Sequence, residues 1–196
     1  MGNIAHLPTK NKQSTAFLSA GIVTLWMCAA LPAHAEIDLS RDPFAAQDIA
    51  LISTCIDAAT SWETGRDCAN ITYKVCVGRI NGNVSHAAEA GCNSRERDLW
   101  LHLYSLDALQ IEAWTLWKDQ QMRAVGDNRI HAHDSFQQLD SAWQDYRKVQ
   151  CQMEVAHYGT GNAKMTDQPI CEICLIADGV LKLRALRAKM SVNVFP

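Results

Sequence analysis

Eight cysteines in a chain of 196 residues constrain this sequence more than any other feature. One of them, Cys28, lies in an apolar run near the N-terminus. The other seven come later in the chain: Cys55, Cys68, Cys76, Cys92, Cys151, Cys171 and Cys174. Thiols pair in oxidising compartments, and each bond restricts the unfolded chain. We therefore expect a fold held together by disulfides, provided that the protein leaves the cytosol.

The N-terminal segment has the pattern of an export signal. Lys10 and Lys12 precede an apolar run over residues 16–31, and Ala33-His34-Ala35 is the small–any–small pattern that signal peptidase cuts. The run is too short to favour a membrane span. We expect a signal peptide over residues 1–35, cleavage near Ala35, and a mature chain that is periplasmic or secreted without stable membrane insertion.

The charge balance narrows the class of partner. The first 35 residues carry two lysines and no acidic residue, so the net charge of −3 becomes −5 without them. A mildly acidic chain speaks against general nucleic-acid binding, which needs a concentrated basic face. It favours approach to a basic protein, mainly by speeding association.

The apolar spacing is helical along nearly all of the mature chain, and no strand pattern competes with it. Helices are predicted from Asp42-Pro43, over about 66–77, over about 86–122, from Asp134 or Ser135 to Gly159, and after an irregular stretch that ends at Pro169. Within the last helix, Asp178-Gly179 is expected to be a weak point. The fold class is thus all-α: one domain over 36–196, a small disulfide-stapled bundle of about four to five helices with a long antiparallel pair.

Four apolar stripes are expected to form the core of this bundle. The first helix contributes Ile49, Ile52 and Ile56. The long helix contributes Leu99, Leu103, Leu106, Gln110, Ala113 and Trp117. The next helix contributes Phe136, Leu139, Trp143, Tyr146, Gln150, Met153 and His157. The last helix contributes Ile173, Ile176, Val180, Leu183, Leu186 and Met190.

The positions of the cysteines relative to the expected turns suggest three disulfides. Cys55 and Cys68 flank one helix–helix turn, and Cys76 and Cys92 flank the Asn-Gly loop after it. Cys151 is expected to pair with Cys174 across the glycine-rich connection, with Cys171 as the spare thiol. Spacing alone does not fix connectivity, so either Cys171 or Cys174 could be the odd one.

Catalytic, haem, zinc and redox motifs receive little support. In Cys171-Glu172-Ile173-Cys174, the next residue is Leu175 rather than the His of a haem site, and no second cysteine pair has zinc-finger spacing. A thioredoxin-like site would need an α/β pattern around it. His131 and His133 are expected in an exposed loop. We expect no enzyme activity, no metal and no cofactor.

The segment Gln138–Cys151 carries a resemblance to a known family. It combines a Gln-rich helix, Trp143, the pair Tyr146-Arg147 and then Cys151, and it resembles the hallmark of the LprI-like lysozyme-inhibitor family (LprI N-terminal-like domain). Upstream residues resemble other positions of that family: Cys92, Glu96, Trp100, Leu103 and Tyr104. The likeness is strongest over 92–190. Lys148 replaces a frequent Asp, the Leu-Asn pair after the Trp is replaced by Leu103-Tyr104, and Cys171 is extra.

The resemblance implies an exported binding protein that inhibits lysozyme by occluding its cleft rather than by chemistry. Trp143, Arg147 and Cys151 would then be structural, and a loop over 158–168 would contact the partner. The candidate contact residues of that loop are Tyr158, Thr160, Asn162, Lys164 and Thr166. The alternative is a non-enzymatic envelope structural or stress protein that binds another protein or a cell-wall fragment. The sequence leaves the oligomeric state open.

Overall fold

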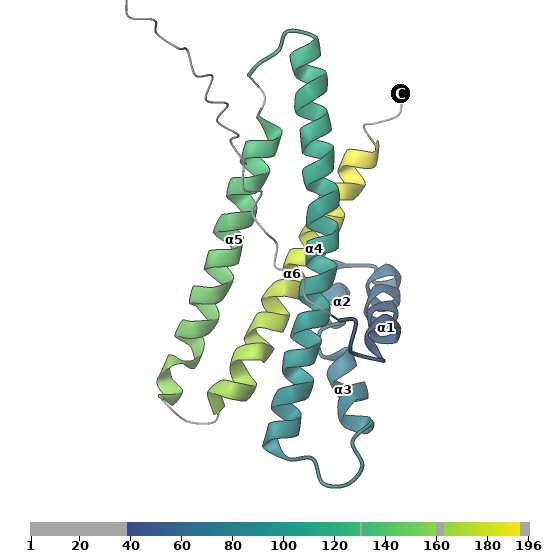
Figure 1. The fold of residues 1–196 in the computed structure, drawn as a ribbon, viewed down its shortest axis with the longest axis vertical. Coiled ribbons are helices and arrows are strands. Elements are labelled where there is room, and N and C mark those ends of the chain that lie inside the picture. Colours follow the sequence, from purple (N-terminus) through teal and green to yellow (C-terminus); the bar gives the residue numbers. More distant parts are fainter. Residues whose placement is uncertain (1–38, 130, 160–162, 193–196) are drawn as a thin grey trace, which may run out of the picture. The chain divides into compact units, whose positions relative to one another are not determined.

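Long α-helices make up most of the structure, a computed structural model that describes residues 39–129, 131–159 and 163–192 (Figure 1). In chain order these helices are α1 (Ala45–Ala58), α2 (Trp62–Arg66), α3 (Ile71–Gly78), α4 (His86–Ala124), α5 (Ala132–Val155), the 3-10 helix η1 (Ala156–Tyr158) and α6 (Ala163–Val192). No strand occurs within those ranges. The predicted all-α class is confirmed. The predicted signal peptide, residues 1–35, lies outside the described residues.

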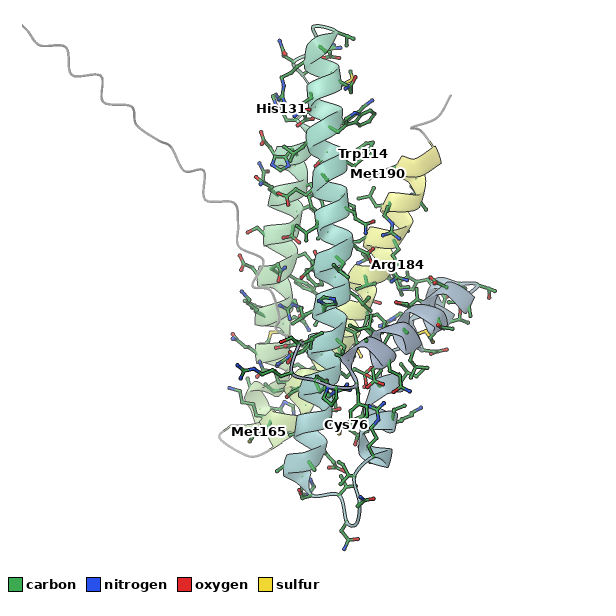
Figure 2. The ribbon with its side chains drawn as sticks, turned by 45° about the vertical axis from the view of Figure 1, so that its right-hand side comes forward. Cys76, Trp114, His131, Met165, Arg184 and Met190 are labelled. Atoms are coloured by element: carbon green, nitrogen blue, oxygen red, sulfur yellow. A yellow bond between two sulfur atoms is a disulfide. The ribbon has the colours of Figure 1, made fainter. Side chains whose placement is uncertain are left out.

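The three longest helices pack along one another. α5 runs back antiparallel to α4, and α6 returns to pack against both of them (Figure 1). The short helices lie on the other side of α4 from α5, where α1 and α3 contact α4 and α2 contacts α6 (Figures 1 and 2). The expected long antiparallel pair is thus α4 and α5, with α6 completing the layer.

The core confirms two of the predicted stripes and corrects a third. On α6, Ile173, Ile176, Val180 and Leu183 are buried, and on α1 Ile52 and Ile56 are buried. On α4, Leu99 and Leu103 are buried as expected, but the predicted stripe is wrong beyond them, since Leu106 and Trp117 are exposed. The buried face continues through these residues instead: Tyr104, Asp107, Ala108, Ile111, Thr115 and Asp119. Because this face includes polar residues, a search for regularly spaced apolar residues does not detect it.

The predicted α5 stripe is confirmed at Phe136, which is buried, and at Trp143, which packs against the core, but it is wrong at three other positions. Leu139, Tyr146 and Met153 are 59%, 56% and 65% exposed. The face that packs against α4 and α6 carries Phe136, Arg147, Cys151 and Val155, which are all buried. An arginine counts as a surface residue in a periodicity argument, so the outer apolar face of α5 gave the stronger pattern.

Local backbone chemistry moves two of the predicted helix boundaries. Asp42 does not cap a helix at Pro43. It forms a turn, in which its carboxylate accepts the Phe44 N–H at 2.9 Å and its carbonyl accepts the Ala45 N–H, and α1 begins at Ala45. The helix predicted over about 66–77 begins only at Ile71, as α3, because residues 67–70 form a turn in which Asn70 adopts a left-handed φ of 69°. A separate short helix, α2, ends at Arg66, where the prediction began.

Two buried carboxylates of α4 cap other helices. Glu96 accepts the Tyr73 N–H in the first turn of α3, whose N-cap residue Asn70 makes no side-chain cap. Asp119 accepts the N–H groups of Ala132 and His133 at 2.8 and 3.1 Å, at the start of α5. The predicted caps Asp134 and Ser135 are therefore wrong, since both residues lie within the first turn of α5.

The start of α6 also differs from the prediction. The stretch up to Pro169 was expected to be irregular, yet α6 begins at Ala163 and continues through Pro169. Pro169 is the seventh residue of α6, beyond the first turn, so the helix continues there without one of its backbone hydrogen bonds. The connection between η1 and α6 is correspondingly short.

Among the described residues, three disulfides join the helices. Cys55–Cys68 joins α1 to the segment before α3, and Cys76–Cys92 joins α3 to α4, as predicted. The third bond is Cys151–Cys171, so the expected Cys151–Cys174 pairing with a spare Cys171 is wrong, and Cys174 is the free thiol. The bonds indicate an oxidising extracellular compartment. Within the described part of the chain, no helix has the length and apolar content that crossing a bilayer requires.

Buried ion pairs connect the helices as well. Asp48 of α1 is 1% exposed and receives two hydrogen bonds from the Arg79 guanidinium, at 2.7 and 2.9 Å, and an ion pair from Arg95 of α4 at 2.6 Å. On α4, buried Asp107 accepts hydrogen bonds from Arg184 and Arg187 of α6 at 3.1 and 2.6 Å. Two arginines of the second half of α6 thus pair with a buried carboxylate of α4.

Candidate functional site

The end of the α5–α6 hairpin is the candidate functional site. We call it the hairpin end and define it as residues 146–158 of α5 and η1 together with residues 164–175 of α6. Gly159, at a φ of 59°, follows η1 in a conformation that favours glycine. The Cys151–Cys171 disulfide, with a Cα–Cα distance of 5.7 Å, joins the two helices there. Figure 2 labels Met165 at this end of the bundle.

A hollow of about 380 Å³ opens between the two helices of the hairpin end. Its lining combines apolar, acidic and sulfur-bearing side chains: Tyr146, Gln150, Glu154, Val155, His157, Tyr158, Asp167, Ile170, Cys171, Cys174 and Leu175. The volume falls within the range of small-ligand and side-chain pockets. A partner side chain could enter it.

Several apolar side chains of the hairpin end remain open to solvent, and Tyr146, Tyr158 and Ile170 among them line the hollow. Tyr158, Met165 and Ile170 are 40%, 63% and 37% exposed, and Met153 and Tyr146 of α5 are exposed nearby. Single exposed apolar residues are ordinary on a protein surface, but a contiguous group marks an interaction site. This group lies on a segment that a disulfide holds in place.

Two of the predicted contact residues use their hydroxyls inside the hairpin end. The Tyr158 hydroxyl donates to the Asp167 carboxylate, and this hydrogen bond raises the pKa of Tyr158. The Thr166 hydroxyl donates to the same carboxylate at 3.1 Å. The predicted loop is therefore wrong at both positions: Tyr158 belongs to η1 and connects it to α6, and Thr166 stands on α6 beside its partner Asp167.

The other three predicted contact residues have different outcomes. Lys164 lies on the first turn of α6 rather than on a loop, and it is exposed. It lines a second hollow, of about 490 Å³, between the beginnings of α4 and α6, together with Arg97 and Met165. Thr160 and Asn162 lie outside the described residues, so their role stays a prediction.

Cys174 is the free thiol of the described residues, and it lines the same hollow as Cys171. Burial raises the pKa of the Cys174 thiol above its ordinary value. A raised thiol pKa reduces the thiolate fraction and with it the reactivity at neutral pH. The geometry nevertheless places this thiol one helical turn from a disulfide.

Trp143, one of the resemblance residues, packs within the bundle. Its ring stacks on Tyr104 of α4 with centroids 4.1 Å apart and planes 12° apart. The Tyr104 hydroxyl donates to Asp140 at 2.6 Å. The pKa of Tyr104 is raised mainly by burial and further by this hydrogen bond. The predicted structural role of Trp143 is thus the one that its contacts support.

Arg147 is also an interior residue. It is 6% exposed and lies 3.6 Å from the Glu172 carboxylate of α6, with its guanidinium 5.6 Å from the Trp143 ring centroid. Burial lowers its pKa, which the charge of Glu172 opposes. Of the three motif residues Trp143, Tyr146 and Arg147, Tyr146 is the one that lines the hollow.

Sequence reasoning missed Met165, Ile170 and Asp167 as members of this site. The available signal was the second apolar face of α5, the 139–146–153 spacing, which was assigned to the core. If this face of α5 had been predicted to be exposed, the sequence would have indicated an apolar surface at the hairpin end. Metal chemistry finds no support among the described residues, where no three metal-ligating side chains gather.

In comparisons with known proteins, no family model, no curated protein and no solved structure matches the chain. The LprI-like resemblance therefore rests on the residues quoted above and stays a prediction.

Proposed function

We propose that this protein is an exported, non-catalytic binding protein that inhibits a lysozyme by covering its active-site cleft with the hairpin end. Three lines of support meet in this proposal. The motif around Trp143 resembles that of lysozyme inhibitors, the three disulfides indicate an oxidising compartment, and the hairpin end exposes apolar side chains around a hollow. Export through a signal peptide over residues 1–35, to the periplasm or the exterior, is part of the same proposal.

The observation that carries the proposal is the exposure of Met153, Tyr158, Met165 and Ile170 on a covalently joined helix pair. Interfaces draw most of their binding energy from a few apolar and aromatic anchors. A segment that is already ordered loses little conformational entropy on binding. The hairpin end combines both properties.

Charge supports a basic partner. The chain without residues 1–35 carries a net charge of −5. Glu154 and Asp167 add negative charge within the hairpin end. Lysozyme surfaces are commonly basic, so long-range attraction would speed encounter and weaken with salt. Lys164, exposed at the start of α6, is one cation at this end that could pair with a cleft carboxylate.

Inhibition would be steric. Lysozyme cleaves glycan with two carboxyl groups that flank the scissile bond, so a side chain lodged between them blocks substrate. The apolar rim would cover the edges of the cleft, and Lys164 would approach the carboxylates. No bond is made or broken by the inhibitor.

The test is a glycan-hydrolysis assay with a basic lysozyme and increasing concentrations of the purified exported protein. We expect loss of turnover at micromolar protein. The double variant Tyr158→Ala with Met165→Ala should need at least about tenfold more protein for the same inhibition, because two anchors are lost.

Val125→Ala is the matched control, since Val125 is exposed just after α4, at the opposite end of the α4–α5 pair from η1. It should inhibit like the unaltered chain. Full hydrolysis in the presence of the unaltered protein at micromolar concentration would reject the lysozyme proposal. Recovery of a different envelope protein on immobilised chain would favour the alternative binding function.

A further inference from the structure

Three sulfur atoms lie together at the hairpin end. Cys171 and Cys174 are neighbours on one face of α6, because side chains three residues apart on a helix have Cβ atoms about 5–6 Å from each other. Cys171 is bonded to Cys151 of α5, and Cys174 is a free thiol. Both α6 cysteines line the same hollow. A thiol therefore lies within one helical turn of a disulfide, with open space between the helices.

We propose that Cys151, Cys171 and Cys174 form an internal thiol–disulfide exchange site. The Cys174 thiolate attacks the sulfur of Cys151, the Cys151–Cys174 bond forms, and the Cys151–Cys171 bond breaks. Cys171 leaves as a thiolate and takes up the proton that Cys174 lost. The number of disulfides is unchanged, so the step needs no oxidant or reductant. This inference concerns the sulfur chemistry of the hairpin end and stands apart from the proposed lysozyme partner.

The exchange would move the covalent anchor between α5 and α6. Three residues along a helix correspond to a rise of about 4.5 Å. With the bond at Cys174, the disulfide-closed loop is three residues longer, and the first turns of α6 are held less tightly against α5. Ile170, which lines the hollow, and Met165 lie on this part of α6, so the two pairings would hold these exposed side chains differently.

The groups around Cys174 set the rate of this step. Burial raises the pKa of the Cys174 thiol, Arg66 of α2 opposes that shift, and Asp178, Glu154 and Glu96 reinforce it from α6, α5 and α4. The other ionisable side chains that line the hollow are Tyr146, His157, Tyr158 and Asp167. Because the thiolate is the attacking species, the exchange is slow at neutral pH and accelerates by about tenfold per pH unit below the thiol pKa.

Glu172 lies between the two α6 cysteines, so a protease that cuts after Glu places Cys171 and Cys174 on different peptides. The full chain, exported into an oxidising compartment and purified, is incubated without denaturant at pH 7 and at pH 9. Free thiols are then capped with N-ethylmaleimide, and the protein is cut after Lys and Glu. The peptides 149–154, 165–172 and 173–182 then carry Cys151, Cys171 and Cys174 separately.

We expect the cap on peptide 173–182 at the start, and on peptide 165–172 in a growing fraction of molecules at pH 9. The rate should not depend on protein concentration. A cap that stays wholly on Cys174 after prolonged incubation at pH 9 overturns the proposal. So does capping of Cys55, Cys68, Cys76 or Cys92, which would mean general scrambling, or a rate proportional to protein concentration.

The variant Cys171→Ser provides an independent readout. Exported into the same compartment, it should form Cys151–Cys174 and leave no thiol to cap, while Cys174→Ser should keep Cys151–Cys171 and also leave none. A folded Cys171→Ser chain in which Cys151 and Cys174 both accept the cap contradicts the proposal. If this variant does not fold, the experiment on the unaltered chain decides.

Discussion

Trp143 of α5 lies so close to Gly179 of α6 that a Cβ atom on the glycine would come within 2.6 Å of the indole Cζ2. The same Cβ would lie 3.0 Å from Tyr104 of α4. Glycine at this position therefore lets α4, α5 and α6 meet at one point. The sequence pattern suggested that Asp178-Gly179 weakens the last helix, whereas the tertiary contact shows why a residue without a side chain is needed.

Gly179→Ala should destabilise the protein even though alanine is the better helix former. The added methyl group meets two stacked rings that have little room to move, and overpacking of this kind costs about 1–3 kcal/mol. Urea unfolding followed by circular dichroism measures the change. Gly91→Ala on α4 is the matched control, because nothing lies within 4 Å of its Cβ position. It should be neutral or stabilising by up to about 1 kcal/mol.

Asp48→Asn should reduce the dependence of stability on acid pH. Burial alone would raise the pKa of Asp48, but hydrogen bonds from Arg79 and Arg95 outweigh it and hold the pKa below the ordinary value of 3.8. A carboxyl group with a depressed pKa in the folded state stabilises the fold above its unfolded pKa, and this contribution is lost as the pH falls through the folded pKa. The unaltered protein should therefore lose stability below about pH 4.

The measurement is the free energy of unfolding in urea at pH 7 and pH 3. Asp48→Asn should cost about 3 kcal/mol at pH 7, because Arg79 loses its ion pair and Arg95 keeps only that with Asp42. The variant should lose less stability than the unaltered chain on acidification. Asp57→Asn is the control, since its side chain is 75% exposed beside Arg184. It should change stability by less than about 1 kcal/mol. Equal acid sensitivity of Asp48→Asn and the unaltered chain would contradict the assignment.

Asp119→Ala should fray the first turn of α5. The Asp119 carboxylate accepts the N–H groups of Ala132 and His133, and these hydrogen bonds outweigh burial and lower its pKa. Amide hydrogen exchange should show lost protection at these two positions and unchanged protection in α6. Asp134→Ala removes the cap expected from the sequence and should leave exchange at Ala132 and His133 unaltered. The opposite pattern would restore Asp134 as the cap.

Phe136→Ala and Leu139→Ala should have very different effects on the free energy of unfolding, although the two residues are only three positions apart on α5. Phe136 is buried against α4 and α6, so its loss should cost about 3–5 kcal/mol. Leu139 is exposed, and its replacement should stay within about 0.5 kcal/mol. Urea unfolding of the two variants therefore reports which face of α5 is inside. Comparable losses would mean that Leu139 also faces the core, as its spacing predicted.

Much of this fold was predictable because the relevant signals are local. Helical spacing identified the long helices, the α6 stripe from Ile173 to Leu183 is buried as expected, and the two N-terminal disulfides span turns that the sequence shows. The candidate site was predicted in part. Tyr158 is exposed at the hairpin end, while Thr166 is engaged by Asp167 and Lys164 stands on a helix.

The amino-acid sequence by itself determined an all-α chain whose cysteines can staple it, because periodicity and covalent reach act over a few residues. The tertiary structure decided which face of α5 is buried, which cysteine bonds to Cys151, and which carboxylates cap α3 and α5. Each of these depends on groups brought together from distant parts of the chain: Arg147 on Glu172, Cys151 on Cys171, Asp119 on Ala132. A charged side chain is buried only where a partner from another part of the chain offsets the cost of removing it from water. The local sequence does not show which residue that partner is.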